Sequence, residues 1–156
     1  MAMSQIQIKT RVKGLSNEQW SMLLNLLNSQ MEKNQEKLNG KCNMRAWMID
    51  TGASHHMTRS LKLLCDVKSV IACPVGLPNG KEVMAEKKGN IVLDGRLKLT
   101  NVLYVPSLNC NMISVSQLVE ESNCIIQFTN KFYVIQDRTS RILIGAGEQR
   151  GGLYYF

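Results

Sequence analysis

The clearest periodic pattern in the chain lies near its N-terminus, over residues 15–38. Ser16 and Gln19 have the spacing of a capping box at the start of this segment, and Asn39-Gly40 is a typical helix stop. Apolar side chains recur between them at helical spacing and form one stripe: Trp20, Leu23, Leu24, Leu27 and Met31. The pattern predicts an N-terminal amphipathic α-helix.

Three roles fit this helix. It packs on the barrel, pairs with its copy in a dimer, or is a linker helix that is ordered only in the parent polyprotein. A helix of about 22 residues would span about 33 Å, more than a small barrel can cover completely. Self-association is therefore a second expectation for it.

Beyond residue 41 the pattern changes to short apolar runs separated by turns. Residues 96–100 alternate strictly and predict a strand with one solvated face, whereas residues 102–105 are apolar and look buried on both faces. The spacing of the runs predicts a mainly β fold, a small barrel or a sandwich. Strands are expected at residues 44–50, 67–75, 80–86, 89–93, 96–105, 124–129, 131–136, 141–144 and 152–156.

Two segments interrupt these strands. The sequence Leu77, Pro78, Asn79 and Gly80 is a strong turn signal between apolar runs, and it predicts a hairpin tip. Residues 114–121 place three apolar side chains on one face and predict a single short helix. The chain thus divides into an N-terminal segment, residues 1–41, and a β domain, residues 42–156.

The composition of the 156 residues, 44% hydrophobic and 20% charged, is that of an ordinary globular protein. No apolar stretch approaches the roughly 18 residues that a membrane span needs, and the N-terminus lacks the apolar core of a secretory signal. A cytoplasmic protein without membrane contact is therefore expected. The five cysteines include no Cys-x-x-Cys pair, which argues against a zinc ribbon.

The net charge of +7 is concentrated in the first part of the chain, where residues 1–47 hold seven basic against three acidic residues. Such a bias would give weak, salt-sensitive contact with nucleic acid. The basic residues are scattered and are not interleaved with aromatic ones, so a solvated basic surface is the alternative.

The strongest chemical signal is the sequence Asp50-Thr51-Gly52, which follows an apolar run. Aspartic proteases present their catalytic acid on such a turn, and their chemistry needs two carboxylates that share one proton. The other aspartates, Asp66, Asp94 and Asp137, are not followed by Thr/Ser-Gly. The partner of Asp50 is therefore expected to be Asp50 of a second copy.

Two histidines, His55 and His56, follow this turn. Adjacent residues of a strand point to opposite faces, and no cysteine or acidic residue stands at ligand spacing, so no metal site is predicted. The histidines are expected to shape the rim of the turn.

Several segments, in this order, resemble the protease region of copia-type retrotransposon polyproteins, a branch of the retropepsin-like aspartic proteases. The resemblance extends from about residue 12 to residue 156. It rests on residues 47–58 (WMIDTGASHHMT), 77–80 (LPNG), 101–106 (NVLYVP), 111–118 (NMISVSQL) and 152–156 (GLYYF).

The resemblance implies a small closed β-barrel of the retropepsin-like type with one short helix, preceded by the N-terminal helix. It implies that Asp50 is catalytic, that Thr51 hydrogen-bonds across a dimer, and that Gly52 allows close backbone approach. The flap over the substrate would be Leu77, Pro78, Asn79 and Gly80. Residues 111–118 would form the strand beneath the catalytic loop and lead into the helix, with Ser114 where many retropepsins have glycine.

The function implied is that of an aspartic endopeptidase that works as a homodimer, processes a retrotransposon Gag-Pol polyprotein or a peptide, and needs no metal or other cofactor. The other hypothesis is a catalytically silent β-barrel remnant that acts as a binding or self-association module. Because nothing like a zinc knuckle or an integrase flanks the matching segments, the chain is expected to be a piece of a polyprotein or a remnant of a decayed element.

Overall fold

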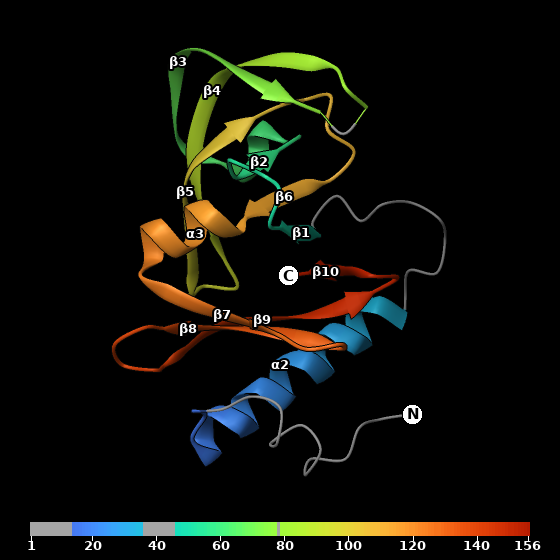
Figure 1. Cartoon of the computed structure of the whole chain (residues 1–156), viewed down its shortest axis with the longest axis vertical. Helices are drawn as coiled ribbons and strands as arrows, with labels where there is room; N and C mark the ends of the chain where they lie inside the picture. Colours follow the sequence, from blue (N-terminus) through green and yellow to red (C-terminus); the bar gives the residue numbers. More distant parts are fainter. Residues whose placement is uncertain (1–13, 36–45, 78) are drawn as a thin grey trace. The chain divides into compact units, whose positions relative to one another are not determined.

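The computed structural model describes residues 14–35, 46–77 and 79–156 (Figure 1). The chain forms two compact units, one made of residues 1–41 and 123–156 and the other of residues 42–122. The sequence predicted two domains, 1–41 and 42–156, and their boundary after residue 41 is also a boundary between the two units. The division into these two domains stays a prediction.

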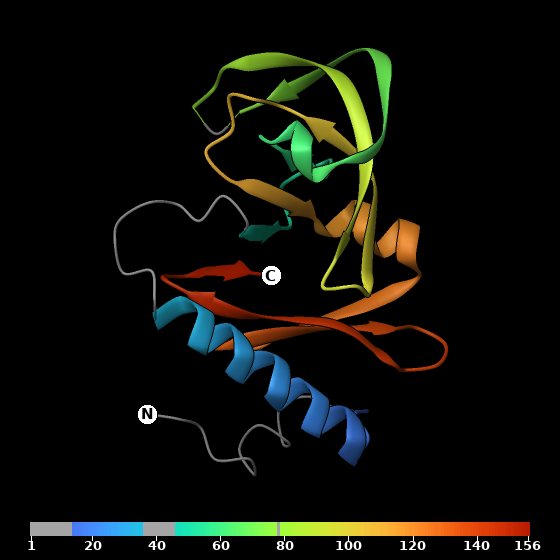
Figure 2. The ribbon, with the colours of Figure 1, turned by 180° about the vertical axis from the view of Figure 1, so that it is seen from behind.

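The first unit is a helix on an antiparallel sheet (Figure 2). Its strands follow one another in chain order, so that each pairs with the next. The elements are α2 (Asn17–Gln35), β7 (Cys124–Phe128), β8 (Phe132–Asp137), β9 (Leu143–Arg150) and β10 (Leu153–Tyr155).

The predicted N-terminal helix is confirmed over Asn17–Gln35, and its expected last residues, 36–38, lie outside the described part. The capping box is also confirmed. The Gln19 N–H donates to Ser16 Oγ at 3.2 Å, and the Ser16 N–H donates to Gln19 Oε1 at 3.0 Å. Two backbone N–H groups that would otherwise lack partners are satisfied by this pair.

The apolar stripe of α2 packs on the sheet beside it, which is the first of the three roles considered. Trp20 is 6% exposed and Leu23 is fully buried, while Leu24 and Leu27 are partly buried against the same cluster. The sheet side of that cluster consists of Phe132, Val134, Leu143 and Ala146. Burial of these side chains stabilises the unit through the hydrophobic effect.

In its described residues, 46–77 and 79–122, the second unit contains six strands and a short helix. They are β1 (Trp47–Asp50), β2 (Met57–Thr58), β3 (Cys65–Gly76), β4 (Glu82–Leu93), β5 (Leu97–Tyr104), β6 (Asn111–Ser114) and α3 (Val115–Ser122), with a 3₁₀ turn, η1, at Leu61–Leu63. The strands are ordered β3-β4-β5-β2-β6-β1. The pairs β5/β2 and β6/β1 are parallel, and the others are antiparallel.

The fold is therefore mainly β with few helices, as predicted, but a closed barrel is not confirmed. Within the described residues of this unit, no pairing joins β3 to β1. The outer strand β3 carries two register shifts against β4 and a proline, Pro74. Bulges and proline interrupt the regular row of hydrogen-bonding groups that closure through β3 would use.

The predicted hairpin and the predicted short helix are both present. Strands β3 and β4 pair from Val75 opposite Val83 towards the turn at Leu77, and α3 begins one residue later than expected. Neither described helix is long and apolar enough to cross a membrane.

Glycines account for two wrong strand boundaries. The sequence suggested separate strands at 80–86 and 89–93, but β4 is continuous and has a register shift beside Gly89. A Cβ on Gly89 would lie 2.7 Å from the carbonyl oxygen of Cys65, so this glycine allows close approach of two backbones and does not end the strand. Likewise the expected strand 141–144 stopped before Gly145, whereas β9 continues through Gly145 and Gly147 to Arg150.

Candidate functional site

Asp50 is the last residue of β1, a strand with alternating burial. Trp47 and Ile49 are buried at 2% and 6% exposure, while Met48 and Asp50 are partly exposed. The strand is aligned in parallel with β6, and Asp50 stands opposite Ser114. A buried strand thus holds the backbone of Asp50, and the residues that follow, Thr51 and Gly52, are exposed.

The turn after β1 orients the Asp50 carboxylate. The Gly52 N–H donates to Asp50 Oδ1 at 2.7 Å, a short, charge-assisted hydrogen bond. A Cβ at position 52 would lie 3.3 Å from the same oxygen, so any other residue would require the Asp50 side chain to shift slightly. The close backbone approach implied for Gly52 stays a prediction.

Ser114, at the end of β6, is hydrogen-bonded to the residue that follows this turn. Its hydroxyl donates to the carbonyl oxygen of Ala53 at 2.7 Å and accepts the Gln117 N–H at 3.2 Å. The second of these bonds caps the first turn of α3. One fully buried side chain thus connects the Asp50 turn to the helix.

His56 occupies the adjoining buried position, which corrects the expectation that both histidines lie at the rim. It is fully buried, its Nδ1 accepts the Ser114 N–H at 3.0 Å, and its own N–H donates to Gln117 Oε1 at 2.8 Å. Only His55 stays partly exposed, with Nδ1 2.9 Å from Ser54 Oγ. The alternation rule does not apply to them, because both histidines precede β2 and lie outside any strand.

The charge state of His56 follows from this burial. Desolvation lowers its pKa from 6.5 to about 4, although the nearby Glu121 carboxylate acts in the opposite direction. His56 is therefore neutral near pH 7. Because Nδ1 accepts the Ser114 N–H, the proton is on Nε2, and Glu121 Oε2 lies 3.7 Å from that atom.

Glu121 and Gln117 continue the polar network along α3. Gln117 Nε2 donates to the carbonyl oxygen of Thr100 at 3.0 Å and to Glu121 Oε1 at 2.8 Å. Burial acts to raise the pKa of Glu121, but hydrogen bonds from Gln117 and from the Thr100 N–H outweigh it and hold this pKa below its usual value. The helix therefore presents a carboxylate towards the buried imidazole.

A second buried polar pair lies between β2 and β6. The Thr58 hydroxyl donates to Asn111 Oδ1 at 2.8 Å, and Asn111 Nδ2 donates to the carbonyl oxygen of Ala46 at 3.2 Å. Both side chains are at most 1% exposed. This pair ties the entry of β1 to its neighbouring strands.

Sequence reasoning missed these supporting residues, although a signal existed for part of the group. Ser114 and Gln117 have the Ser-x-x-Gln spacing of a capping box at the start of the expected short helix. In the structure Gln117 uses its side-chain oxygen on His56 instead of closing the box.

Of the predicted flap residues, Leu77, Asn79 and Gly80 lie at the tip of the β3–β4 hairpin. The Leu77 N–H donates to the Lys81 carbonyl oxygen at 2.7 Å, and the Gly80 N–H donates to the Leu77 carbonyl oxygen at 2.9 Å. Gly80 has a φ of +77°, and Asn79 Oδ1 accepts the Lys81 N–H at 3.0 Å. Pro78 lies outside the described residues.

The turn and the hairpin rest on one apolar cluster. Ala53, Met48 and Leu77 are partly buried against it. Its buried members are Met57, Val75, Ala85, Leu103, Val105, Leu108 and Met112. Among the described residues, no hydrogen bond joins the hairpin tip to residues 50–52, so the assignment of a flap stays a prediction.

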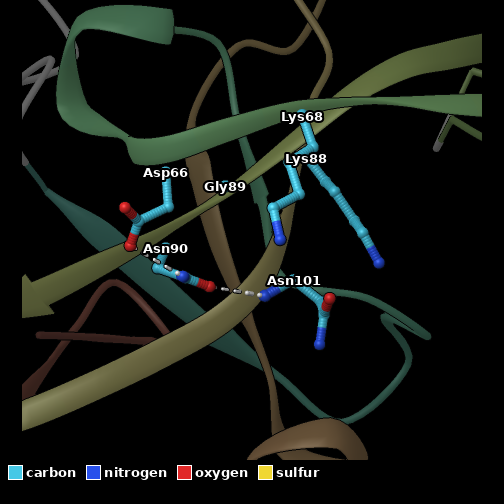
Figure 3. A pocket seen from close by; sticks show the side chains of 6 residues that line it. All are labelled: Asp66, Lys68, Lys88, Gly89, Asn90 and Asn101. Carbon is cyan, nitrogen blue, oxygen red and sulfur yellow. Dashed lines mark hydrogen bonds between the residues drawn. The ribbon is translucent and has the colours of Figure 1, made fainter.

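A pocket elsewhere in this unit contains none of the predicted site residues. It has a volume of about 210 Å³ and forms where β3, β4 and β5 shift register (Figure 3). Asn90 donates to Asp66 at 3.3 Å and accepts the Asn101 N–H at 3.3 Å, which closes one side. Lys68 and Lys88, directly opposite in register, line the other side.

Comparison with known proteins identifies the family. A family model described as the beta-barrel domain of Pol polyprotein matches residues 47–124. The chain is also similar to the retrovirus-related Pol polyproteins from transposons RE1 and RE2 of Arabidopsis thaliana, at 26% identity over 112 and 121 residues. These stretches cover 69% and 75% of this chain but only 8% of each polyprotein.

No solved structure is significantly similar to the chain. The family match begins at the first residue of β1 and includes the Asp50 turn, the β3–β4 hairpin and α3. It covers half of the chain, and both relatives are polyproteins of the same kind. The chain therefore belongs to the family of Pol polyprotein beta-barrel domains.

Proposed function

We propose that this chain is an aspartic endopeptidase that acts as a homodimer and processes a retrotransposon polyprotein. One Asp50 from each copy would form the catalytic pair, in a retropepsin-like arrangement. One carboxylate acts as general base on a water that attacks the scissile peptide carbonyl, and the other acts as general acid. Thr51 hydrogen-bonds across the dimer, and Leu77 to Gly80 close over an extended peptide.

The geometry of the Asp50 carboxylate carries this proposal. Its Oδ1 accepts the Gly52 N–H, and its Oδ2 has no hydrogen-bond partner among the described residues. One oxygen is thus held by the protein, while the other is left for a second carboxylate or a water. The Oδ1 bond alone is that of an Asx turn, which a purely structural turn also uses. The second oxygen and the family match, which includes this turn, therefore support the proposal.

The substrate in this proposal follows from the family. The two relatives are named as Pol polyproteins, and the chain corresponds to 8% of the length of each. A polyprotein must be cut into its parts, so its own chain is the substrate we propose. The cytoplasmic location expected from the sequence belongs to the same proposal.

The test is whether the Asp50→Asn variant of this chain still cleaves a polyprotein to which it is fused. Cleavage should be lost, and the parent activity should peak at mildly acidic pH because the pair must keep one proton. The matched control is Asp94→Asn, because Asp94 is exposed and has a φ of +47°, which asparagine also tolerates. Persistent cleavage by Asp50→Asn would refute the proposed mechanism.

Sedimentation distinguishes this function from the silent binding module. The proposal requires that the chain dimerise at the concentration at which it cleaves. A strict monomer at high micromolar concentration, without cleavage, would favour the module. Weak nucleic-acid contact through the basic N-terminal segment is a separate proposal, which requires affinity to fall steeply with salt.

A further inference from the structure

Ser114 makes more connections within the site than its size suggests. A serine hydroxyl has one proton and two acceptor lone pairs. Its proton is used on the Ala53 carbonyl at 2.7 Å, so at the 3.1 Å contact with Ser116 Oγ the donor must be Ser116. The Gln117 N–H occupies the remaining acceptor position.

The backbone of Ser114 adds a further connection. Its N–H donates to His56 Nδ1, and its Cα is aligned with that of Asp50 across the parallel pair β1/β6. Ser114 therefore joins the residue just after the catalytic turn, the buried imidazole and the first turn of α3. The chain distances between these partners are large, 61 residues for Ala53 and 58 for His56.

We propose that Ser114 is a positioning residue. Its backbone is held by His56 Nδ1 and its hydroxyl by the first turn of α3, and the hydroxyl fixes the carbonyl of Ala53 and thereby the orientation of the Asp50 carboxylate. The catalytic consequence rests on the proposed function. The structural consequence does not, because the Asp50 to Gly52 hydrogen bond exists in the single chain. Serine supplies here a bond that glycine at this position would lack.

The physical reason is the cost of a buried unpaired polar group. Ser114 is 0% exposed, so its removal leaves the Ala53 carbonyl and the Gln117 N–H without the partner that now satisfies them. The turn can recover by moving its carbonyl towards water. That movement would rotate the backbone three residues after Asp50 and weaken the Gly52 N–H bond to Oδ1.

The first test needs no enzymatic activity. In the ¹⁵N-labelled chain, Ser114→Ala should shift the Gly52 amide resonance and speed its hydrogen exchange. Ser116→Ala is the matched control, because it removes the neighbouring exposed hydroxyl but keeps the bond to Ala53. Ser114→Thr, which keeps the hydroxyl, should restore slow exchange. An unchanged Gly52 amide in folded Ser114→Ala would overturn the proposal.

The second test measures catalysis. Ser114→Ala should lower kcat by about 10- to 100-fold with little change in KM, as expected when a catalytic group is misplaced and not removed. Ser116→Ala should keep the parent kcat. If Asp50→Asn retains cleavage, the proposed function fails, yet the Gly52 amide still decides the role of Ser114. An effect on KM alone would contradict positioning.

Discussion

The Ser114 N–H donates to Nδ1 of His56 at 3.0 Å, and both residues are fully buried. This bond requires an imidazole whose Nδ1 is unprotonated, so it exists only while His56 is neutral. The stability of the turn above it is thereby linked to the titration of one side chain.

The first prediction concerns stability in acid. Burial lowers the pKa of His56 from 6.5 to about 4, so between these values the unfolded state binds more protons than the folded state. The contribution of His56 to the free energy of unfolding therefore has its full value above pH 6.5 and decreases as the pH falls towards 4. The total loss through this group is at most about 3 kcal/mol. Urea titrations from pH 7.5 to 4 would measure it.

The variant His56→Asn should flatten this dependence. Asparagine offers an acceptor oxygen in a position similar to that of Nδ1 but does not titrate. The control His55→Asn retains His56 and should keep most of the parent slope, because the charge of His55 is the smallest of the three effects on the pKa of His56. Equal slopes for His56→Asn and the parent chain would contradict the prediction.

The second prediction concerns the start of α2. Ser16→Ala removes the acceptor of the Gln19 N–H and should lower the free energy of unfolding by about 1 kcal/mol. Gln19→Ala should cost more, because Gln19 Nε2 also donates to the Arg141 carbonyl oxygen at 2.9 Å. Asn28→Ala, at an exposed position inside the helix, is the control and should be neutral or slightly stabilising. Chemical denaturation measures all three.

The third prediction concerns Gly147 in β9. A Cβ there would overlap the carbonyl oxygen of Tyr155 and the ring of Tyr133, and the first of these is backbone that cannot turn away. Gly147→Ala should therefore cost about 1–3 kcal/mol of stability, as overpacking does. At Gly76 an added Cβ meets nothing within 4 Å, so Gly76→Ala is the control and should leave the thermal midpoint nearly unchanged. Similar midpoints for the two variants would refute this account.

Local signals were sufficient for several elements. The helix stripe and the Ser16–Gln19 pair predicted α2 because their contacts are formed between residues three or four apart. The Leu77 to Gly80 turn predicted the hairpin for the same reason. The strand boundaries expected before Gly89 and Gly145 were wrong because a glycine that packs closely against another segment looks, in one sequence, like a glycine that ends a strand.

Part of the candidate site could also be predicted from local signals, and part could not. The Asp50-Thr51-Gly52 turn, including the short bond from Gly52 to Asp50, is formed by neighbours in the chain and could be read from their order. Strand β6 was expected only through the family resemblance, because its four residues are too few to show a period. His56 could not be distinguished from His55, because both lie in an irregular segment before β2, where no strand or helix period indicates which side chain is buried.

The sequence by itself therefore determined the capped helix, the mainly β character, the hairpin and the aspartate turn, all of which depend on short spacings and local turn chemistry. Only the tertiary structure decided that His56, Ser114 and Gln117 lie together beneath that turn, and that β3 and β1 leave the described sheet of their unit open. Such contacts join residues about 60 positions apart. They form because buried polar groups must find partners wherever the packed strands place them.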